Sequence, residues 1–254
     1  MISEIKSTDV VVNLAGASLA GKNPLSMRWT KNRKTEIISS RIQAGSILSN
    51  ALEQATHKPE VLIQASAIGF YGNHGENQVT ENSPPGNDFL ASVCQPWEKS
   101  TSNVEELGIR RVIPRIGLVL SSEGGLLPLL SLPFKMYIGG KIGTGRQIMS
   151  WIHITDLVKS LEYFIENPQT QGVYNITAPE AVTNQEFASQ VSSTLNRPTW
   201  FSIPSFLLKL TLGEAATLAL DGREVLPKRL LEAGFQFQFN QLSTALDDLF
   251  NSRN

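Results

Sequence analysis

Residues 9–18, DVVVNLAGAS, run from three consecutive valines into a turn of small residues. A short apolar run that ends in this way is typical of a buried strand in a parallel sheet. In nucleotide-binding α/β proteins, small residues at such a turn allow another molecule to approach the backbone. The stretch therefore predicts a parallel strand at 10–14 that is followed by a ligand-contacting turn.

Composition limits the class of protein. The chain has 254 residues and is 41% hydrophobic, which suffices for one large core with or without a small appendage. A net charge of −1 gives no electrostatic basis for binding nucleic acid or an anionic membrane. The single cysteine, Cys94, excludes an internal disulfide framework and fits a reducing compartment. No apolar run reaches the ~20 residues of a membrane helix, and we expect a cytoplasmic protein.

The order of the predicted elements indicates an α/β fold with a parallel sheet, because strands alternate with helices. Strands are predicted at 10–14, from 61 to 63, at 111–120, at 173–176 and at 235–239. Helices are predicted at 30–54 and 89–107, from Asp156 onward, after a capping box at Thr183–Glu186, and near 241–250. From about residue 204 the chain is mostly helical, so we divide it into a domain at 1–203 and a small C-terminal unit at 204–254.

Two conspicuous polar patterns have simple structural explanations. The glycine-rich segment 139–146 leads into strand-like Ser150–Ile154, whereas a dinucleotide loop leads from a strand into a helix. We therefore interpret it as a structural or substrate-side loop. His153 and Asp156 are a candidate acid–base pair, but Asp156 is more simply the N-cap of the helix that it opens. The three histidines show no metal-ligand spacing, so no metal site is predicted.

The segment SAIGFYG, residues 66–72, is more informative. Ser66 and Tyr71 follow the end of a predicted parallel strand, which is where open α/β sheets bind ligands. Packing at the strand end, followed by a turn, explains the pattern equally well.

Together these segments resemble the extended short-chain dehydrogenases/reductases, the NAD(P)-dependent epimerase/dehydratase group. VVNLAGAS resembles the fourth strand of that family, and SAIGFYG resembles its fifth-strand signature. ENSPPGNDFLASVCQPWE and GTGRQIMSWIHITDLV resemble two later segments of the family. With RWT, SRI and LPKRLLEAGFQF, the whole chain is most similar to an atypical branch that carries a C-terminal domain of unknown function.

The resemblance implies that NADP or NAD binds at the carboxyl ends of the parallel strands. It implies backbone contacts from Leu14, Ala15 and Gly16. Arg41 either faces a cofactor phosphate or is a solvated helix charge. The other roles that it implies are catalysis by Ser66 and by Tyr71 as proton donor, closure of the pocket by Arg115 to Val119, and substrate-side positions for Arg146, Trp151 and His153. The helices at 30–54 and 89–107 are implied to form a homodimer interface.

The chain departs from the family in two places that bear on chemistry. The family's Y-x-x-x-K pair corresponds to Phe89 and Val93, which have no proton to give and no charge. An arginine that holds substrate phosphate in sugar-nucleotide enzymes corresponds to Met149. These changes argue against the usual acid–base chemistry and against a nucleotide-sugar substrate.

The third departure concerns the N-terminus. The family begins with a strand, a glycine-rich turn that binds the pyrophosphate, and a helix, a unit of ~30 residues or more. Only eight residues precede Asp9. We therefore expect a Rossmann-like sheet that lacks its N-terminal strands, exposes the edge at 10–14, and binds NAD(P)H only weakly.

The sequence leaves three functions open. The first is an NAD(P)(H)-binding epimerase- or reductase-like enzyme with an unknown small-molecule substrate. The second is a non-catalytic dinucleotide-binding regulator of the cell-division-inhibitor type. The third is a non-functional, N-terminally truncated fragment.

Overall fold

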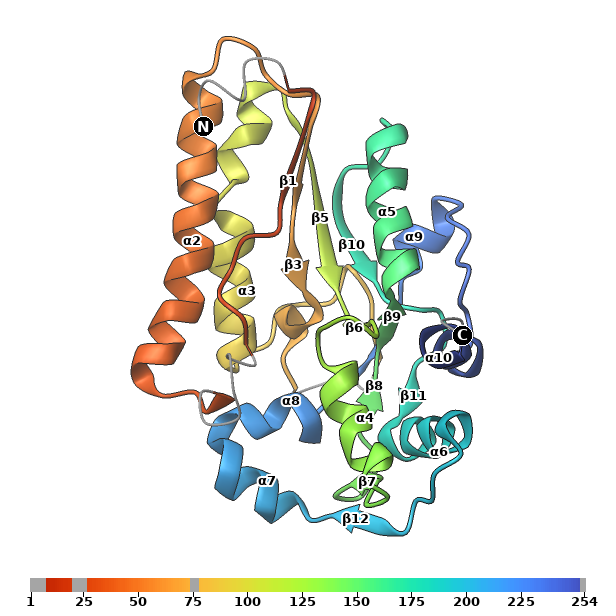
Figure 1. The fold of residues 1–254 in the computed structure, drawn as a ribbon. Coiled ribbons are helices and arrows are strands. Elements are labelled where there is room, and N and C mark those ends of the chain that lie inside the picture. Colours follow the sequence, from red (N-terminus) through yellow and green to blue (C-terminus); the bar gives the residue numbers. More distant parts are fainter. Residues whose placement is uncertain (1–7, 20–26, 74–77, 252–254) are drawn as a thin grey trace.

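A parallel sheet occupies the centre of the protein, whose computed structural model describes residues 8–19, 27–73 and 78–251 (Figure 1). The strand order is β1-β2-β5-β10, and every pairing is parallel. These strands span Val10–Asn13, Val61–Gln64, Arg110–Ile116 and Gly172–Ile176, and β3 (Ser66–Ala67) also pairs with β5. The predicted α/β fold is confirmed, and among the described strands β1 lies at the edge.

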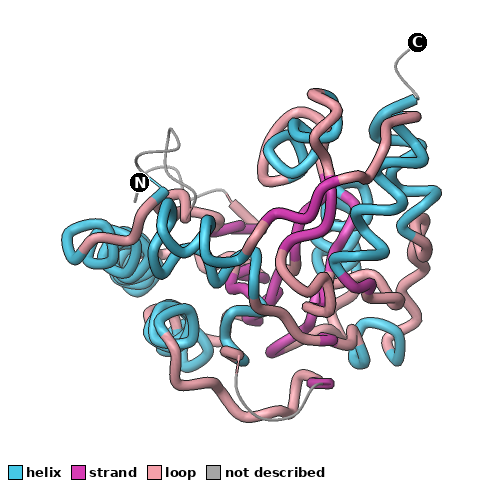
Figure 2. The backbone as a smooth tube through the Cα atoms, turned by 90° about the horizontal axis from the view of Figure 1, so that it is seen from below, coloured by secondary structure: helices cyan, strands magenta, loops and turns pink. Residues whose placement is uncertain are grey.

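Side chains of β2 alternate between the two faces of the sheet, as a strand requires. Leu62 packs with Leu48 and Leu52 of α2 (Lys31–Gln54). Ile63 packs on the other face with Phe164 of α5 (Ile154–Glu166). Helices therefore cover both faces, and Figure 2 shows the strands between them.

The two helices on the α2 side follow the prediction to different extents. α2 is confirmed almost to the residue, and its N-cap Thr30 accepts a hydrogen bond from the Arg33 amide. The predicted helix at 89–107 is wrong in its length. α3 (Phe89–Lys99) ends at Ser100, whose hydroxyl donates to the Trp97 carbonyl, and a 3₁₀ helix, η3, follows at Ser102–Leu107.

The predicted strand at 111–120 is two strands separated by Gly117. β5 stays in the main sheet, whereas β6 (Leu118–Leu120) pairs with β9 (Trp151–His153). A Cβ atom on Gly117 would lie 2.7 Å from the Ser150 carbonyl oxygen. Because only glycine lets the two backbones approach so closely, this residue allows the chain to change partners.

The start of α5 corrects the assignment of Asp156. His153 is the N-cap, and its Nδ1 accepts a hydrogen bond from the Thr155 amide. The buried carboxylate of Asp156 instead accepts from the amides of Gln238 and Phe239, each at 2.9 Å. The predicted strand at 235–239 is wrong, because this segment is a loop. A carboxylate, and not a neighbouring strand, accepts hydrogen bonds from two of its amides.

The smaller elements complete the architecture. The capping box at Thr183 and Glu186 is confirmed and begins α6 (Asn184–Leu195). The remaining elements before residue 204 are η2 (Ile68–Tyr71), β4 (Gln78–Val79), α4 (Leu127–Lys135), β7 (Gly140–Ile142), β8 (Ile148–Met149), β11 (Val182–Thr183) and β12 (Phe201–Ile203). None of the described helices has the length and apolar character needed to cross a membrane.

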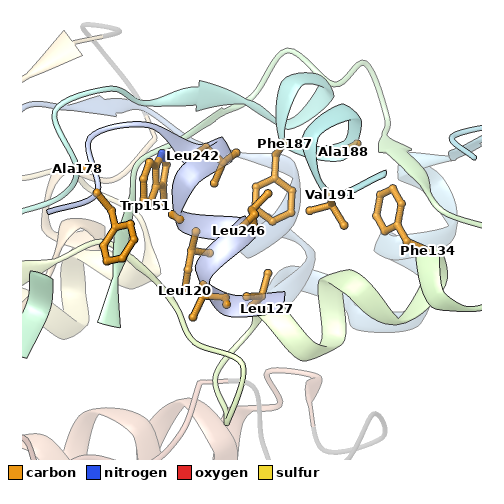
Figure 3. Close-up of a cluster of buried hydrophobic side chains, with 13 residues drawn as sticks. Leu120, Leu127, Phe134, Trp151, Ala178, Phe187, Ala188, Val191, Leu242 and Leu246 are labelled. Atoms are coloured by element: carbon orange, nitrogen blue, oxygen red, sulfur yellow. The ribbon is translucent and has the colours of Figure 1, made fainter. Parts of the chain in front are cut away.

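The segment after residue 204 contributes to three separate hydrophobic clusters of the protein. It contains α7 (Ser205–Leu212), η4 (Gly213–Ala216), α8 (Thr217–Leu220), β13 (Glu224–Val225), α9 (Lys228–Glu232) and α10 (Leu242–Asn251). Ala215 packs with Trp29 and Val93 below α2 and α3, and Leu230 packs against the sheet. Leu246 of α10 joins a third cluster with Phe187 of α6 (Figure 3).

We predict that Gly117→Ala destabilises the protein by about 1–3 kcal/mol, because the added methyl group overlaps the Ser150 carbonyl. The matched control is Gly124→Ala, since nothing lies within 4 Å of a Cβ atom there. Its effect should stay within about 0.5 kcal/mol. Urea unfolding of both variants measures the difference, and equal stabilities would contradict the close-approach argument.

Candidate functional site

A cavity of about 510 Å³, here called cavity A, lies at the carboxyl ends of the parallel strands. Its walls include the strand-end segments 67–69 and 116–119, which contain Val119. α3 supplies Phe89, Val93 and Cys94, and the C-terminal segment supplies Leu218 and Arg223. This is the expected position for a ligand site in an open parallel sheet, and the volume is in the usual range for one.

A second cavity of about 340 Å³, here called cavity B, adjoins the first. Apolar side chains of α4, β8 and α7 surround it, among them Leu130, Met149 and Leu208. The residues that line both cavities are Leu19, Ile68, Leu118, Leu126, Leu218, Asp221, Gly222 and Arg223. The two cavities therefore share a wall that contains an arginine and an aspartate.

Arg41 is a buried cation at one side of cavity A. It is 9% exposed, which contradicts the solvated-charge interpretation. Its Nη1 donates to the carbonyls of Ala17 and Ile37, both at 3.0 Å, while its Nε is buried without a hydrogen-bond partner. Burial lowers the pKa of Arg41. A buried guanidinium with a free donor is suited to an anionic ligand.

The turn after β1 lies beside this arginine. A Cβ atom on Gly16 would lie 3.0 Å from the Arg41 side chain, so the turn needs a small residue there. Leu14 is 57% exposed, and the Ala15 amide donates to the Asn13 side chain. These three turn residues are outside the walls of cavity A, which Leu19 reaches. Their contact with a cofactor stays a prediction.

The hydroxyls of Ser66 and Tyr71 belong to a buried network behind the strand ends. Tyr71 donates to Asn175 Oδ1 at 2.7 Å and accepts from Arg115 Nη1 at 3.0 Å. Arg115 also binds both carboxylate oxygens of Glu98, at 2.8 and 2.9 Å, and Ser66 donates to the same carboxylate at 2.6 Å. Burial raises the pKa of Tyr71. The structure brings Ser66, Tyr71 and Arg115 together, but none of them lines cavity A. The catalytic roles of Ser66 and Tyr71 and the cofactor-side role of Arg115 stay predictions.

The α3 side of cavity A offers little for proton transfer. Phe89 and Val93 line it, in keeping with the departure seen in the sequence. Cys94 also lines it, but burial raises the pKa of its thiol to about 12. Such a thiol is neither a nucleophile nor an acid at neutral pH.

None of the three predicted substrate-side residues lines either cavity, and their substrate-side roles stay predictions. Trp151 is buried in the cluster of Figure 3, and its indole donates to the Glu180 carbonyl at 2.9 Å. His153 is buried against Phe239, and burial lowers its pKa. Arg146 is exposed on the glycine-rich loop. The first part of that segment forms β7, which pairs with β12.

Sequence reasoning missed Glu98 and Arg223. Glu98 stood in the quoted run QPWE, directly before Lys99, and its position in that motif was the available signal. Arg223 had no local signal, because its place beside the cavities depends on contacts with distant residues. Within the described residues, no group of histidine, cysteine or acidic side chains is arranged to hold a metal ion.

Comparisons with known proteins agree with this geometry. Residues 1–177 match the NAD dependent epimerase/dehydratase family, and residues 203–249 match a domain of unknown function, DUF1731. The epimerase family protein YfhF of Bacillus subtilis is 40% identical over 98% of this chain and 80% of YfhF.

Two solved structures are also similar. The human epimerase family protein SDR39U1 (isoform 2) with NADPH has a TM-score of 0.89 and 31% identity, over 98% of this chain and 85% of that chain. A nucleoside-diphosphate sugar epimerase from Corynebacterium glutamicum has a TM-score of 0.79 and 30% identity, over 98% of this chain and 47% of that one.

We predict that Glu98→Gln destabilises the protein by about 3–5 kcal/mol, because it leaves the buried Arg115 guanidinium without its counter-ion. Glu232→Gln is the control, since it removes the partner of Lys228 from an ion pair whose side chains are 57% and 61% exposed. It should cost less than about 1 kcal/mol. Urea unfolding tests both, and a small effect at Glu98 would show that the network is not essential for stability.

We also predict that Cys94 in the folded protein does not react with a thiol reagent at pH 8. With a pKa of about 12, only about one thiol in ten thousand is ionised there. Absorbance with a disulfide reagent measures this, and guanidinium-unfolded protein is the control that should react at once. Rapid reaction of the folded protein would mean that cavity A activates the thiol.

Proposed function

Because the chain belongs to the NAD dependent epimerase/dehydratase family, we propose that it binds NADP(H) or NAD(H) in cavity A and catalyses hydride transfer. The observation that carries this proposal is the cavity at the strand ends with the buried, unpartnered Nε of Arg41 on its wall. The human relative of the same fold was solved with NADPH. When bound, the nicotinamide would give or accept the hydride.

The residues present fit such a group. Arg41 would bind a phosphate oxygen, since it supplies a charge and a free N–H donor. The backbone of 67–69 and 116–118 would lie against the rings, because these strand-end segments line the cavity. The apolar side chains of α3 would pack against the cofactor or the substrate.

A nucleotide sugar does not suit the remaining space. Met149, which stands where sugar-nucleotide enzymes have a phosphate-binding arginine, lines cavity B among other apolar side chains. Because no Tyr–Lys pair lines cavity A on α3, the proton that accompanies the hydride would come from water or from the substrate itself. We therefore propose an oxidoreductase that acts on a largely apolar small molecule.

The test is NADPH binding by saturation-transfer NMR, which detects ligands with millimolar affinity. Arg41→Gln should weaken binding by about tenfold or more, because a charge-assisted hydrogen bond contributes about 1.5–3 kcal/mol. Lys31→Gln is the control, since it removes an exposed cation from the first turn of the same helix. Equal signals from all three proteins would place the cofactor elsewhere.

Turnover separates an enzyme from a protein that only binds the dinucleotide. Oxidation of NADPH in the presence of apolar carbonyl compounds, followed by absorbance, should exceed the rate without them. Binding without turnover on any such compound would support a regulatory protein and contradict the proposed oxidoreductase.

A further inference from the structure

The wall shared by cavities A and B contains an arginine whose side chain makes no ion pair or hydrogen bond with the described residues. The Nε of Arg223 is buried and has no hydrogen-bond partner. A half-buried guanidinium in this state is costly unless a ligand satisfies it. The carboxylates nearby are engaged otherwise: Asp88 caps α3, Glu214 pairs with Lys34, and Asp221 has an interaction of its own.

Distant parts of the chain hold Arg223 in place. The Ser150 hydroxyl donates to the Arg223 carbonyl at 2.7 Å and accepts from the Val225 amide at 2.9 Å. A Cβ atom on Gly222 would lie 1.9 Å from the Ile148 carbonyl oxygen, so the backbone there is pressed against β8. The next residues form β13, which pairs with β4. The arginine is therefore presented from a fixed backbone, as a binding residue should be.

Cavity B itself is suited to a hydrocarbon group. Gln147 donates to the carbonyls of Ile142 and Ala219, and Asn184 accepts from the Ile142 amide. The polar atoms of these two side chains are therefore hydrogen-bonded to the protein backbone, and most of the other residues that line cavity B are apolar. A ligand that fills cavity B gains by burying apolar surface, about 25 cal/mol for each Å².

We propose that Arg223 binds the carboxylate of an apolar acid whose hydrocarbon part lies in cavity B. The inference rests on the proposed function, since it takes cavity A as the cofactor site and makes cavity B the substrate site. A single carboxylate fits better than a diphosphate, because Arg223 is the cation common to both cavities, whereas Asp88, Glu214 and Asp221 in the wall of cavity A would repel further negative charge. Arg223 would thus position the reacting carbon of an apolar oxo- or unsaturated acid at the mouth of cavity A.

The test uses octanoate and 1-octanol as probes with the full chain, measured by saturation-transfer NMR without cofactor. Octanoate should bind more tightly than octanol, and Arg223→Gln should weaken octanoate at least tenfold while octanol changes less than twofold. Arg223→Lys should restore part of the affinity. Lys31→Gln, which removes an exposed cation outside both cavities, should bind octanoate like the wild type. Thermal unfolding of each variant shows that it is folded.

A second variant tests cavity B independently of charge. Ala219→Leu adds volume to its wall and should weaken octanoate without changing NADPH binding. Failure of octanoate to bind, equal binding of octanol, or an unchanged Arg223→Gln would overturn the proposal. Loss of NADPH binding in Arg223→Gln would also overturn it, by assigning this arginine to the cofactor. Octanoate binding that depends on Arg223 in a protein that binds no NADPH would leave the acid site standing and remove the proposed hydride transfer.

Discussion

The two-oxygen ion pair between Arg115 and Glu98 is the interaction on which the site's geometry depends. It joins β5 to α3, and through Tyr71 and Asn175 it reaches Leu226 in the C-terminal segment. Buried charges are tolerated only with good geometry and satisfied neighbours, and Ser66 supplies a further donor here. The network lies behind the strand-end segments that line cavity A and holds them in position.

Polar side chains that bind other parts of the protein are distinct here from polar side chains that line the cavities. Ser66 and Tyr71, which the sequence marked as candidate catalytic residues, are buried and donate hydrogen bonds to Glu98 and Asn175. Of the three arginines whose buried Nε has no hydrogen-bond partner among the described residues, Arg41 and Arg223 line cavity A and Arg33 does not. In the proposed complexes, one anionic group would be bound from the first long helix and the other from the C-terminal segment.

Local signals in the sequence were sufficient for much of the fold. The apolar spacing in α2 and the Thr183–Glu186 pair depend on neighbours within one or two helical turns, and both were predicted. Asp156 was misassigned because its carboxylate binds amides more than 80 residues away. Arg223 was missed for the same kind of reason, since Ser150 fixes its backbone across 73 residues.

The placement of the last wall has a consequence for how the protein is made. During synthesis the N-terminal part of a chain emerges and folds first. The sheet through β10 can then form while Leu208, Leu218 and Arg223 are still inside the ribosome or unfolded. Until they arrive, the apolar side of α4 that later surrounds cavity B faces water. A nascent chain that stalls before residue 223 therefore exposes an apolar surface that is prone to aggregation, and we expect chaperones to bind it at that late stage.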